Sequence, residues 1–295
     1  MPGHNDIRIG TLIHAEGAAE TIRQIAPHGF ESFQITFGER LGEIDPLKLA
    51  HDVRKTLVQI DSPAEISAIG IYGNPLIHDE TASGWPRLIE AARHFGCDVV
   101  GGFTGRIPDE PLDASLPRFR EVFAPLAQAA EDQGVRIAFE NCAMGGDWQR
   151  GDWNIAHSPP AWELMFDAVP SDALGLEWEP CHQLVQLIDP LPQLRKWLPK
   201  VFHIHGKDAS VLWDVVKESG IGGPAEFTYH RTPGFGDTNW TDLISILRLG
   251  GYRGAIDIEG WHDPVYSGDL EMTGQVHALR YLQNCRGGSF VENPS

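Results

Sequence analysis

The sequence lacks several features that would assign it to large classes of protein. No apolar run approaches the length of a membrane-spanning helix, and the first ten residues, MPGHNDIRIG, have neither the basic nor the apolar segment of a secretory signal. Basic residues are scarce: 23 Lys and Arg stand against 41 Asp and Glu, which gives a formal net charge of −18. Such a chain has no basic footprint for a phosphate backbone, so we expect no nucleic-acid partner and no membrane partner. The default compartment is the reducing cytoplasm.

Cysteine and glycine motifs are also missing. None of the four cysteines forms a CxxC pair, which argues against a zinc knuckle or a thioredoxin-type site. Cys97, Cys142 and Cys181 lie in or beside apolar runs, where buried thiols are expected. No GxGxxG follows the first apolar run, Ile7–Ile13, which argues against a dinucleotide-binding fold.

What the sequence does have is a regular alternation of short apolar runs with longer amphipathic runs. The short runs are Ile7–Ile13, Phe30–Phe37, Ile66–Tyr72, Asp98–Thr104, Val135–Cys142, Leu174–Glu179, Val201–His205 and Ala255–Glu259. Asp45-Pro46 is typical of a helix start, and Gly96 of a helix end. Eight β–α units predict an α/β protein, a single (β/α)₈ TIM barrel over residues 1–295, with the barrel at about 7–284 and a tail at 285–295. Ser210–Gly236 is expected to be a long irregular loop that could serve as a lid.

Four consecutive strands of this predicted barrel end in an acidic residue or a histidine. These residues are Glu140, Glu179, His205 and Glu259. The carboxyl ends of barrel strands share one rim, and carboxylates gathered there would repel one another unless a cation lies between them. Three carboxylates and one imidazole favour Mn²⁺, with Mg²⁺, Co²⁺ and Zn²⁺ as alternatives. Each residue alone could equally be a salt-bridge partner or a solvated loop residue.

Neighbouring residues compete for some of these roles. Glu177 lies on the same strand face as Glu179, and we prefer Glu179 as the ligand because it is nearer the strand end. His203 shares a face with His205 and is expected to be a polar group of the interior. Lys207 follows on that face and is expected to reach a substrate from the rim.

Motifs from about Gly70 to Pro264 resemble the sugar phosphate isomerase/epimerase family, which has the xylose isomerase-like TIM barrel and is related to inosose dehydratases and ketose 3-epimerases. The motifs are GNPL (Gly73–Leu76), FTGR (Phe103–Arg106), GVRIAFENC (Gly134–Cys142), NIAHSP (Asn154–Pro159), GLEWEPCHQL (Gly175–Leu184), HIHGKD (His203–Asp208), RTPGFG (Arg231–Gly236) and GYRGAIDIEG (Gly251–Gly260). Their order and spacing together are specific for the family, although not for one substrate.

The resemblance implies that the four strand-end residues bind the metal and that Glu140 and Glu259 also transfer protons. It further implies that His182 and Arg231 contact the substrate. The chain departs from the family in two places: it has Glu-Pro-Cys-His where Asp-Pro-Ser-His is usual, and its segment after Glu259 is one residue longer. Trp261 falls in that segment and is expected to form a stacking wall for a sugar.

These residues predict a metal-dependent isomerase or epimerase that abstracts a proton next to a carbonyl of a small-molecule carbohydrate and passes through an enediolate. The alternative is a lyase that uses the same enediolate for β-elimination, as in inosose dehydration or 3-keto-glycoside cleavage. A metal-dependent endonuclease would require a basic groove, and a non-catalytic sugar-binding protein would show no turnover. A homo-oligomer is common among such enzymes, but no stretch identifies an interface.

Overall fold

The computed structural model describes residues 6–289 and 291–294. Eight strands close into a barrel in the order β1-β10-β7-β6-β5-β4-β3-β2, and β8 and β9 form a separate two-stranded sheet. The strands are β1 Arg8–His14, β2 Ser32–Thr36, β3 Glu65–Ile71, β4 Val99–Gly102, β5 Arg136–Glu140, β6 Leu174–Trp178, β7 Val201–Gly206, β8 Asp208–Val211, β9 Thr228–Arg231 and β10 Ala255–Ile258. The prediction of a (β/α)₈ barrel is confirmed.

Helices alternate with these strands, and several begin and end where the sequence indicates. They are α1 Ala18–Ile25, α2 Pro46–Gln59, α3 Asp79–Phe95, α4 Leu116–Gln133, α5 Pro159–Ala168, α6 Cys181–Leu184, α7 Pro190–Trp197, α8 Trp213–Ser219, α9 Trp240–Leu249 and α10 Glu271–Cys285. The Asp45 side chain accepts hydrogen bonds from two backbone N–H groups of α2, and Pro46 is its first residue. Gly96 ends α3 with φ 91°, a left-handed conformation that glycine adopts without strain. No helix in the described ranges is long and apolar enough to cross a membrane.

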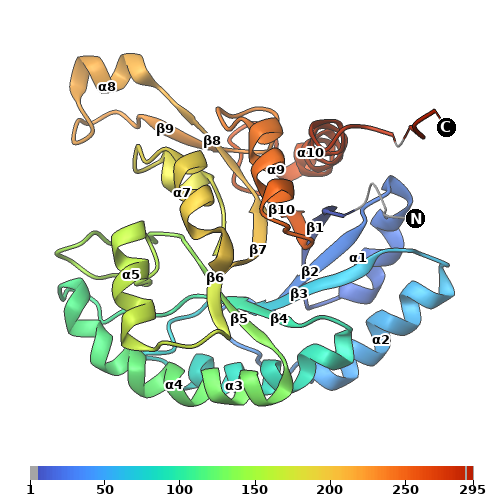
Figure 1. Ribbon diagram of the computed structural model, residues 1–295, viewed down its shortest axis with the longest axis horizontal. Helices are drawn as coiled ribbons and strands as arrows, with labels where there is room; N and C mark the ends of the chain where they lie inside the picture. The colour runs from blue at the N-terminus through green and yellow to red at the C-terminus, as the bar shows by residue number, and fades with distance from the viewer. Residues whose placement is uncertain (1–5, 290, 295) are drawn as a thin grey trace. The chain divides into compact units, whose positions relative to one another are not determined.

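The described chain divides into two compact units. The prediction of a single domain over residues 1–295 stays a prediction. The larger unit comprises residues 12–178 and 200–204. In it α2, α3 and α4 follow one another along the outer side of the strands (Figure 1). An aromatic cluster joins strand to helices: the Phe139 ring lies 4.9 Å from that of Phe123 on α4, and Trp85 of α3 lies 5.4 Å from Phe123. Because strand residues alternate between faces, Glu140 points away from this cluster, toward the interior.

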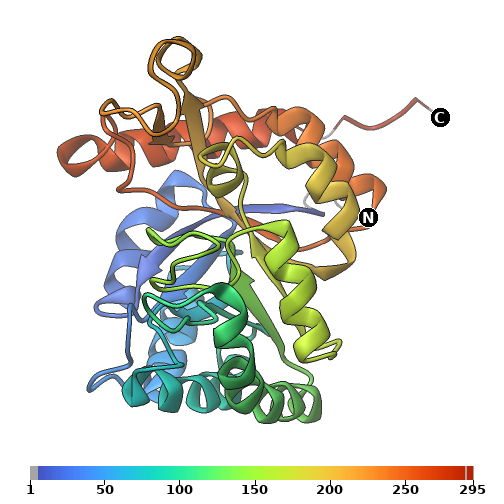
Figure 2. The same ribbon diagram turned by 90° about the vertical axis from the view of Figure 1, so that its left-hand side faces the viewer.

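Among the described residues, the smaller unit comprises 6–11, 179–199, 205–289 and 291–294. Its β1 pairs in parallel with β10, with Arg8 opposite Ala255 and Thr11 opposite Ile258. The ribbon of β8 and β9, with α8 between them, extends away from α9 and α10 and stands out in both views (Figures 1 and 2). The expectation that Ser210–Gly236 is irregular was therefore wrong. The period-two pattern is weak here because the two short strands pair mainly with each other and bury little apolar surface.

Asp208 fastens the base of this ribbon to the start of α9. Its carboxylate accepts hydrogen bonds from Thr238 Oγ1 at 2.6 Å, from Trp240 Nε1 at 2.8 Å and from the Ala209 backbone N–H at 2.8 Å. Burial raises the pKa of Asp208, and these donors oppose that shift. These contacts give Asp208 a structural role in this unit.

Candidate metal centre

Three of the four predicted ligands lie together in the smaller unit. Glu179 directly follows β6, His205 is in β7, and Glu259 directly follows β10. Their relative exposures are 0%, 1% and 7%, and one potential ligand atom from each lies within 4.8 Å of the others. Charged groups are costly to bury without a partner, so this convergence of two carboxylates and an imidazole calls for positive charge among them.

Glu259 is in contact with three basic side chains. Its Oε1 lies 2.9 Å from Lys207 Nζ and 2.9 Å from His262 Nε2, whereas His205 Nδ1 lies 3.3 Å from Oε2. Oε2 is buried and makes no hydrogen bond among the described residues. Burial alone would raise the pKa of Glu259, but Lys207, His205 and His262 outweigh it and hold the pKa well below its usual range. Glu259 is therefore a carboxylate at neutral pH, with one oxygen open to a further cation.

His182 is in contact with Glu179 and Lys207. Its Nε2 lies 2.6 Å from Glu179 Oε1 and 3.4 Å from Lys207 Nζ. Burial, followed by the charge of Lys207 and the neighbouring His230, lowers the pKa of His182 well below its usual value. The imidazole is neutral at physiological pH, as is suitable for a group that holds a hydroxyl by hydrogen bonding.

Two histidines that the sequence analysis did not assign to the site lie beside it. His262 contacts Glu259, and His230 of β9 has its ring centroid 5.2 Å from that of His182 and 5.8 Å from that of His262. The spacing of His262, three residues after Glu259, was a signal that could have identified it. The only sequence signal for His230 was its position next to Arg231, because the two-stranded sheet that contains it was not predicted.

Arg231 and Trp261, both predicted to bind substrate, lie in the same unit. Arg231 Nε donates a hydrogen bond to Asp263 Oδ2 at 2.9 Å, and the guanidinium lies 5.8 Å from the centre of the Phe235 ring. Its side chain is 20% exposed. Trp261 is half-buried with φ 52°, an uncommon conformation for a bulky residue. Asp263, in the loop after β10, thus orients Arg231, and the contact of Arg231 and Trp261 with a substrate stays a prediction.

The remaining predicted ligand, Glu140, belongs to the larger unit. It ends β5, is 5% exposed and stands opposite Glu177 in the register of β5 and β6. Glu140 thus belongs to a different unit from the other three predicted ligands, and its part in a metal site stays a prediction.

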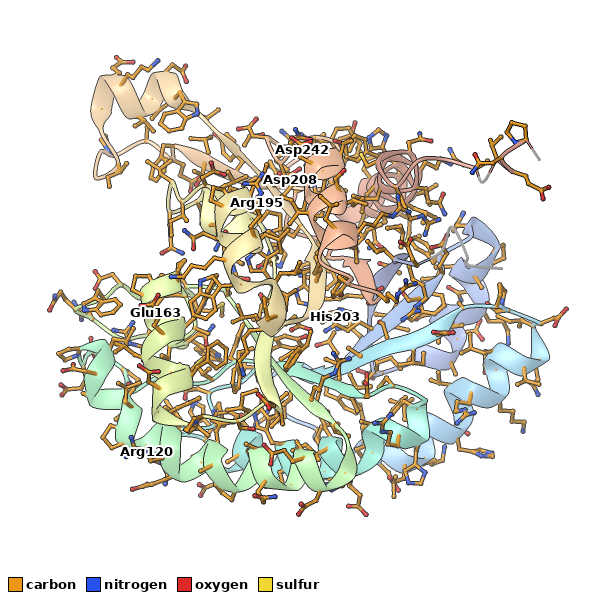
Figure 3. All side chains as sticks on the ribbon, in the orientation of Figure 1. Arg120, Glu163, Arg195, His203, Asp208 and Asp242 are labelled. Carbon is orange, nitrogen blue, oxygen red and sulfur yellow. The ribbon has the colours of Figure 1, made fainter. Side chains whose placement is uncertain are left out.

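Glu177 itself is part of a hydrogen-bonded network inside the larger unit. Its Oε1 accepts from Gln34 Nε2 at 2.6 Å and its Oε2 from the Tyr72 hydroxyl at 2.8 Å. His203 Nε2 lies 2.9 Å from Gln34 Oε1, so His203 joins the same network. Figure 3 shows His203 among the strands, whereas Arg120 and Glu163 lie on the outer helices α4 and α5. Because the Glu177 carboxylate already has these donors, Glu179 is the better ligand candidate.

The donor set of the smaller unit fits a divalent cation. Glu179 and Glu259 offer carboxylate oxygens and His205 an imidazole nitrogen, which suit a hard or borderline ion. The buried Oε2 of Glu259 supplies an oxygen that lacks a hydrogen bond in the described structure. Lys207 supplies one positive charge to the group, which leaves the charge of one carboxylate for a bound cation to neutralise.

Comparison with known proteins first defines the class. A closed parallel barrel with its polar groups at strand ends is the architecture of TIM-barrel enzymes. The family model of the xylose isomerase-like TIM barrel matches residues 22–285, so the chain belongs to that family. The resemblance inferred from the motifs is thereby confirmed.

Curated relatives are distant. An inosose dehydratase of Bacillus thuringiensis (strain Al Hakam) is 25% identical over 174 residues, which are 55% of this chain and 55% of that protein. An inosose dehydratase 2 of Bacillus cereus is 22% identical over 225 residues, which are 71% of this chain and 72% of that protein. The match to the first of these spans about half the length of that relative.

Solved structures share the fold along nearly the whole chain. The 3-keto-D-glucoside 4-epimerase of E. coli matches with a TM-score of 0.69 and 16% identity, and the match covers 95% of this chain and 100% of that one. A D-psicose 3-epimerase matches with a TM-score of 0.67 and 15% identity, covering 96% of this chain and 100% of that one. At such identities the likeness establishes the fold alone.

Proposed function

We propose that the protein is a divalent-metal-dependent isomerase or epimerase of a sugar, keto-sugar or cyclic polyol. The observation that carries this proposal is the buried convergence of Glu179, His205 and Glu259, with Lys207 beside them. Glu140 is proposed as the fourth ligand, on the strength of its place at the end of β5 and the family resemblance. Manganese is the proposed ion, with magnesium, cobalt or zinc as alternatives, because carboxylate oxygens dominate the donor set.

A divalent ion bound by these residues would supply Lewis-acid stabilisation of the negative charge on an enediolate. The residues do the proton transfer. Glu259 is ionised at neutral pH and is suited to remove the proton from the carbon next to a carbonyl. Glu140 is proposed to return a proton to the enediolate. Return of a proton to the opposite face of the same carbon gives epimerisation, whereas return to the adjacent carbon gives isomerisation.

Lys207, His182, Arg231 and Trp261 are proposed to hold the sugar. Lys207 and the neutral His182 can each donate a hydrogen bond to a hydroxyl or carbonyl oxygen. Arg231 is oriented by Asp263, which leaves its terminal guanidinium nitrogens for a further acceptor. The indole of Trp261 offers a flat apolar face of the kind that stacks on a sugar ring.

A second candidate is a lyase that eliminates a β-substituent from the same enediolate. It is favoured by the two curated relatives described above, which are named inosose dehydratases. Glu179, where the family usually has aspartate, is one methylene longer and would place the carboxylate differently at the ion. The first step is shared, so the two reactions differ only in where the electrons of the enediolate go.

Proton exchange in D₂O distinguishes these candidates. Mn²⁺-loaded protein is incubated with a panel of ketoses, inososes and 3-keto-glycosides, and the products are followed by NMR. Deuterium in a new epimer or isomer supports the main proposal, and an unsaturated product supports the lyase. If none of the compounds exchanges a proton for deuterium although manganese is bound, proton abstraction is refuted.

Glutamate-to-glutamine variants assign the residues. Glu140→Gln and Glu259→Gln are each expected to lose at least a hundredfold in rate, since acid–base groups contribute about 10²–10⁴-fold. The matched control is Glu163→Gln, the same change at an exposed position on α5, which is expected to keep full activity. Retained turnover in both site variants would exclude them as the acid–base pair.

A further inference from the structure

The loop at residues 143–153, between β5 and α5, is exposed along most of its length. Trp148 in this loop is 41% exposed, whereas Asn154, the residue directly after it, is fully buried. Glu140, which ends β5, lies only three residues before the loop. Exposed segments with few buried contacts open most readily, so Glu140 would share the motion of the loop unless another group held it.

The side-chain amide of Asn154 binds the end of β5. Its Nδ2 donates hydrogen bonds to the backbone carbonyl oxygens of Glu140 and Cys142, each at 2.8 Å. An asparagine amide has two N–H donors, and both are used on the segment that carries the Glu140 side chain. Buried carbonyl groups need such partners, so this contact fixes the backbone from which the Glu140 side chain extends.

Thr104, two residues after β4, holds the same amide at its oxygen. The Thr104 Oγ1 donates to Asn154 Oδ1 at 2.6 Å, and the Thr104 backbone N–H donates to that oxygen at 3.1 Å. The Thr104 hydroxyl also accepts from the Ile155 backbone N–H at 2.8 Å. Both Thr104 and Asn154 are 0% exposed. In a low-dielectric interior, an amide whose donors and acceptor are all bonded cannot rotate without losing several hydrogen bonds at once.

A glutamate that binds an ion or transfers a proton must be held within about 0.5 Å of its working position. We propose that Asn154 is the positioning residue for Glu140: its amide joins the ends of β4 and β5 and keeps Glu140 in place when the loop at 143–153 moves. The consequence of this contact for ion binding rests on the proposed function. Its effect on the backbone of β5 does not.

Asn74 supplies a matched control in the same unit. It is also 0% exposed, and its amide joins the loops after β3 and β4. Its Nδ2 donates to the Arg106 carbonyl oxygen at 2.6 Å, and its Oδ1 accepts from the backbone N–H groups of Arg106 and Leu76, each at 3.1 Å. Asn74→Ala therefore removes a buried amide of the same kind from the neighbouring loops and leaves the end of β5 alone.

Hydrogen exchange of the metal-free full chain tests the contact without any ion or substrate. Asn154→Ala is expected to speed exchange of the backbone N–H groups in β5 and the two residues after it by about tenfold or more, because two carbonyl partners are lost. Asn74→Ala is expected to leave exchange in β5 unchanged. Thr104→Val removes only the hydroxyl, is expected to act in the same direction as Asn154→Ala, and keeps the test valid where Asn154→Ala does not fold. Exchange in β5 that stays at the wild-type rate would overturn the inference.

Calorimetric titration of Mn²⁺ separates positioning from a general loss of stability. Asn154→Ala is expected to weaken Mn²⁺ binding about 10–100-fold, as loss of a group that orients a ligand does, and Asn74→Ala to leave it unchanged. Combined with Glu140→Gln, the Asn154→Ala change should alter Mn²⁺ affinity by less than about twofold, because the ligand that it positions is already gone. An equal loss of affinity with and without Glu140→Gln would show that Asn154 has a structural role alone.

The two measurements keep this inference apart from the proposed function. If Glu140→Gln binds Mn²⁺ as tightly as wild type, Glu140 is not a ligand, and that part of the proposed function fails. Faster exchange in β5 of Asn154→Ala would then still support the contact between Asn154 and the backbone of Glu140. Unchanged exchange, together with weakened Mn²⁺ binding by Glu140→Gln, refutes the positioning role and leaves the proposed function intact.

Discussion

Replacing Lys207 by methionine tests the electrostatic account of the carboxylate group. Lys207 is 3% exposed, and its Nζ lies 2.9 Å from Glu259 Oε1. Methionine keeps much of the side-chain volume but removes the charge, which leaves the buried Glu259 without its strongest counter-charge. Removing one partner of a buried ion pair costs about 3–5 kcal/mol.

Two remaining contacts place the expected loss at the lower end of this range. His205 and His262 still face the Glu259 carboxylate, at 3.3 Å and 2.9 Å. We expect the metal-free variant to lose about 3 kcal/mol of unfolding free energy. At roughly 2 °C per kcal/mol for a chain of this size, the midpoint of thermal unfolding should fall by roughly 6 °C.

Manganese should reverse much of this loss. An ion at Glu179, His205 and Glu259 replaces the missing positive charge. In the variant it is also no longer repelled by the Lys207 ammonium group. We expect Mn²⁺ to bind the variant at least tenfold more tightly than wild type, a difference of about 1.4 kcal/mol. At a concentration one hundred times the Kd, the ion stabilises a folded protein by about 2.7 kcal/mol.

The assay is thermal unfolding with and without Mn²⁺, together with calorimetric titration of Mn²⁺. Lys48→Met is the matched control, because Lys48 pairs with Asp52 at 2.6 Å on an exposed helix surface, where an ion pair contributes little. That control should leave the unfolding midpoint unchanged. A Lys207→Met protein that unfolds at the wild-type temperature, or that loses stability equally with and without manganese, would refute the reasoning.

Three further predictions concern the polar groups of each unit. Gly101→Ala should lower the free energy of unfolding, measured with denaturant, by about 1–3 kcal/mol, because the added Cβ would clash with the Glu177 carboxylate. An unchanged free energy of unfolding would show that the hydrogen-bonded network around Glu177 rearranges to make room. Tyr72→Phe should cost about 1–3 kcal/mol by the same assay, because Glu177 loses a hydroxyl donor. Burial raises the pKa of Asp263, but three backbone N–H groups and Arg231 outweigh it and lower the pKa below its usual value. The stability that Asp263 contributes is therefore present above the unfolded pKa of about 3.9 and is lost as the pH falls through the folded pKa. Asp263→Asn should be less stable than wild type at pH 7, with a gap that narrows toward pH 3; a gap independent of pH would contradict this.

Much of the barrel could be predicted because its signals are local. The apolar runs mark the strands, and Asp45-Pro46 and Gly96 mark helix ends through their own backbone preferences. Helix starts are harder to predict where such signals are weak: α3 begins at Asp79 with a polar first turn and without a capping side chain.

Candidate ligands could be predicted for a related reason. A carboxylate or imidazole directly after a buried strand has a place set by that strand, so Glu179, His205 and Glu259 were identifiable before their distances were known. The preference for Glu179 over Glu177 also rested on strand position. The structure adds the physical reason, which is that Gln34 and Tyr72 already satisfy the Glu177 carboxylate.

The sequence by itself determined the order of strands and helices, the family, and the residue types at the strand ends, because these depend on hydrophobic period and on motifs along the chain. Only the tertiary structure decided which side chains meet. The ribbon of β8 and β9 is held by pairing between segments about twenty residues apart and by Asp208, and it brings His230 to His182 from 48 residues away in sequence. No local pattern encodes such a contact, since it depends on how the chain packs rather than on what each segment prefers alone.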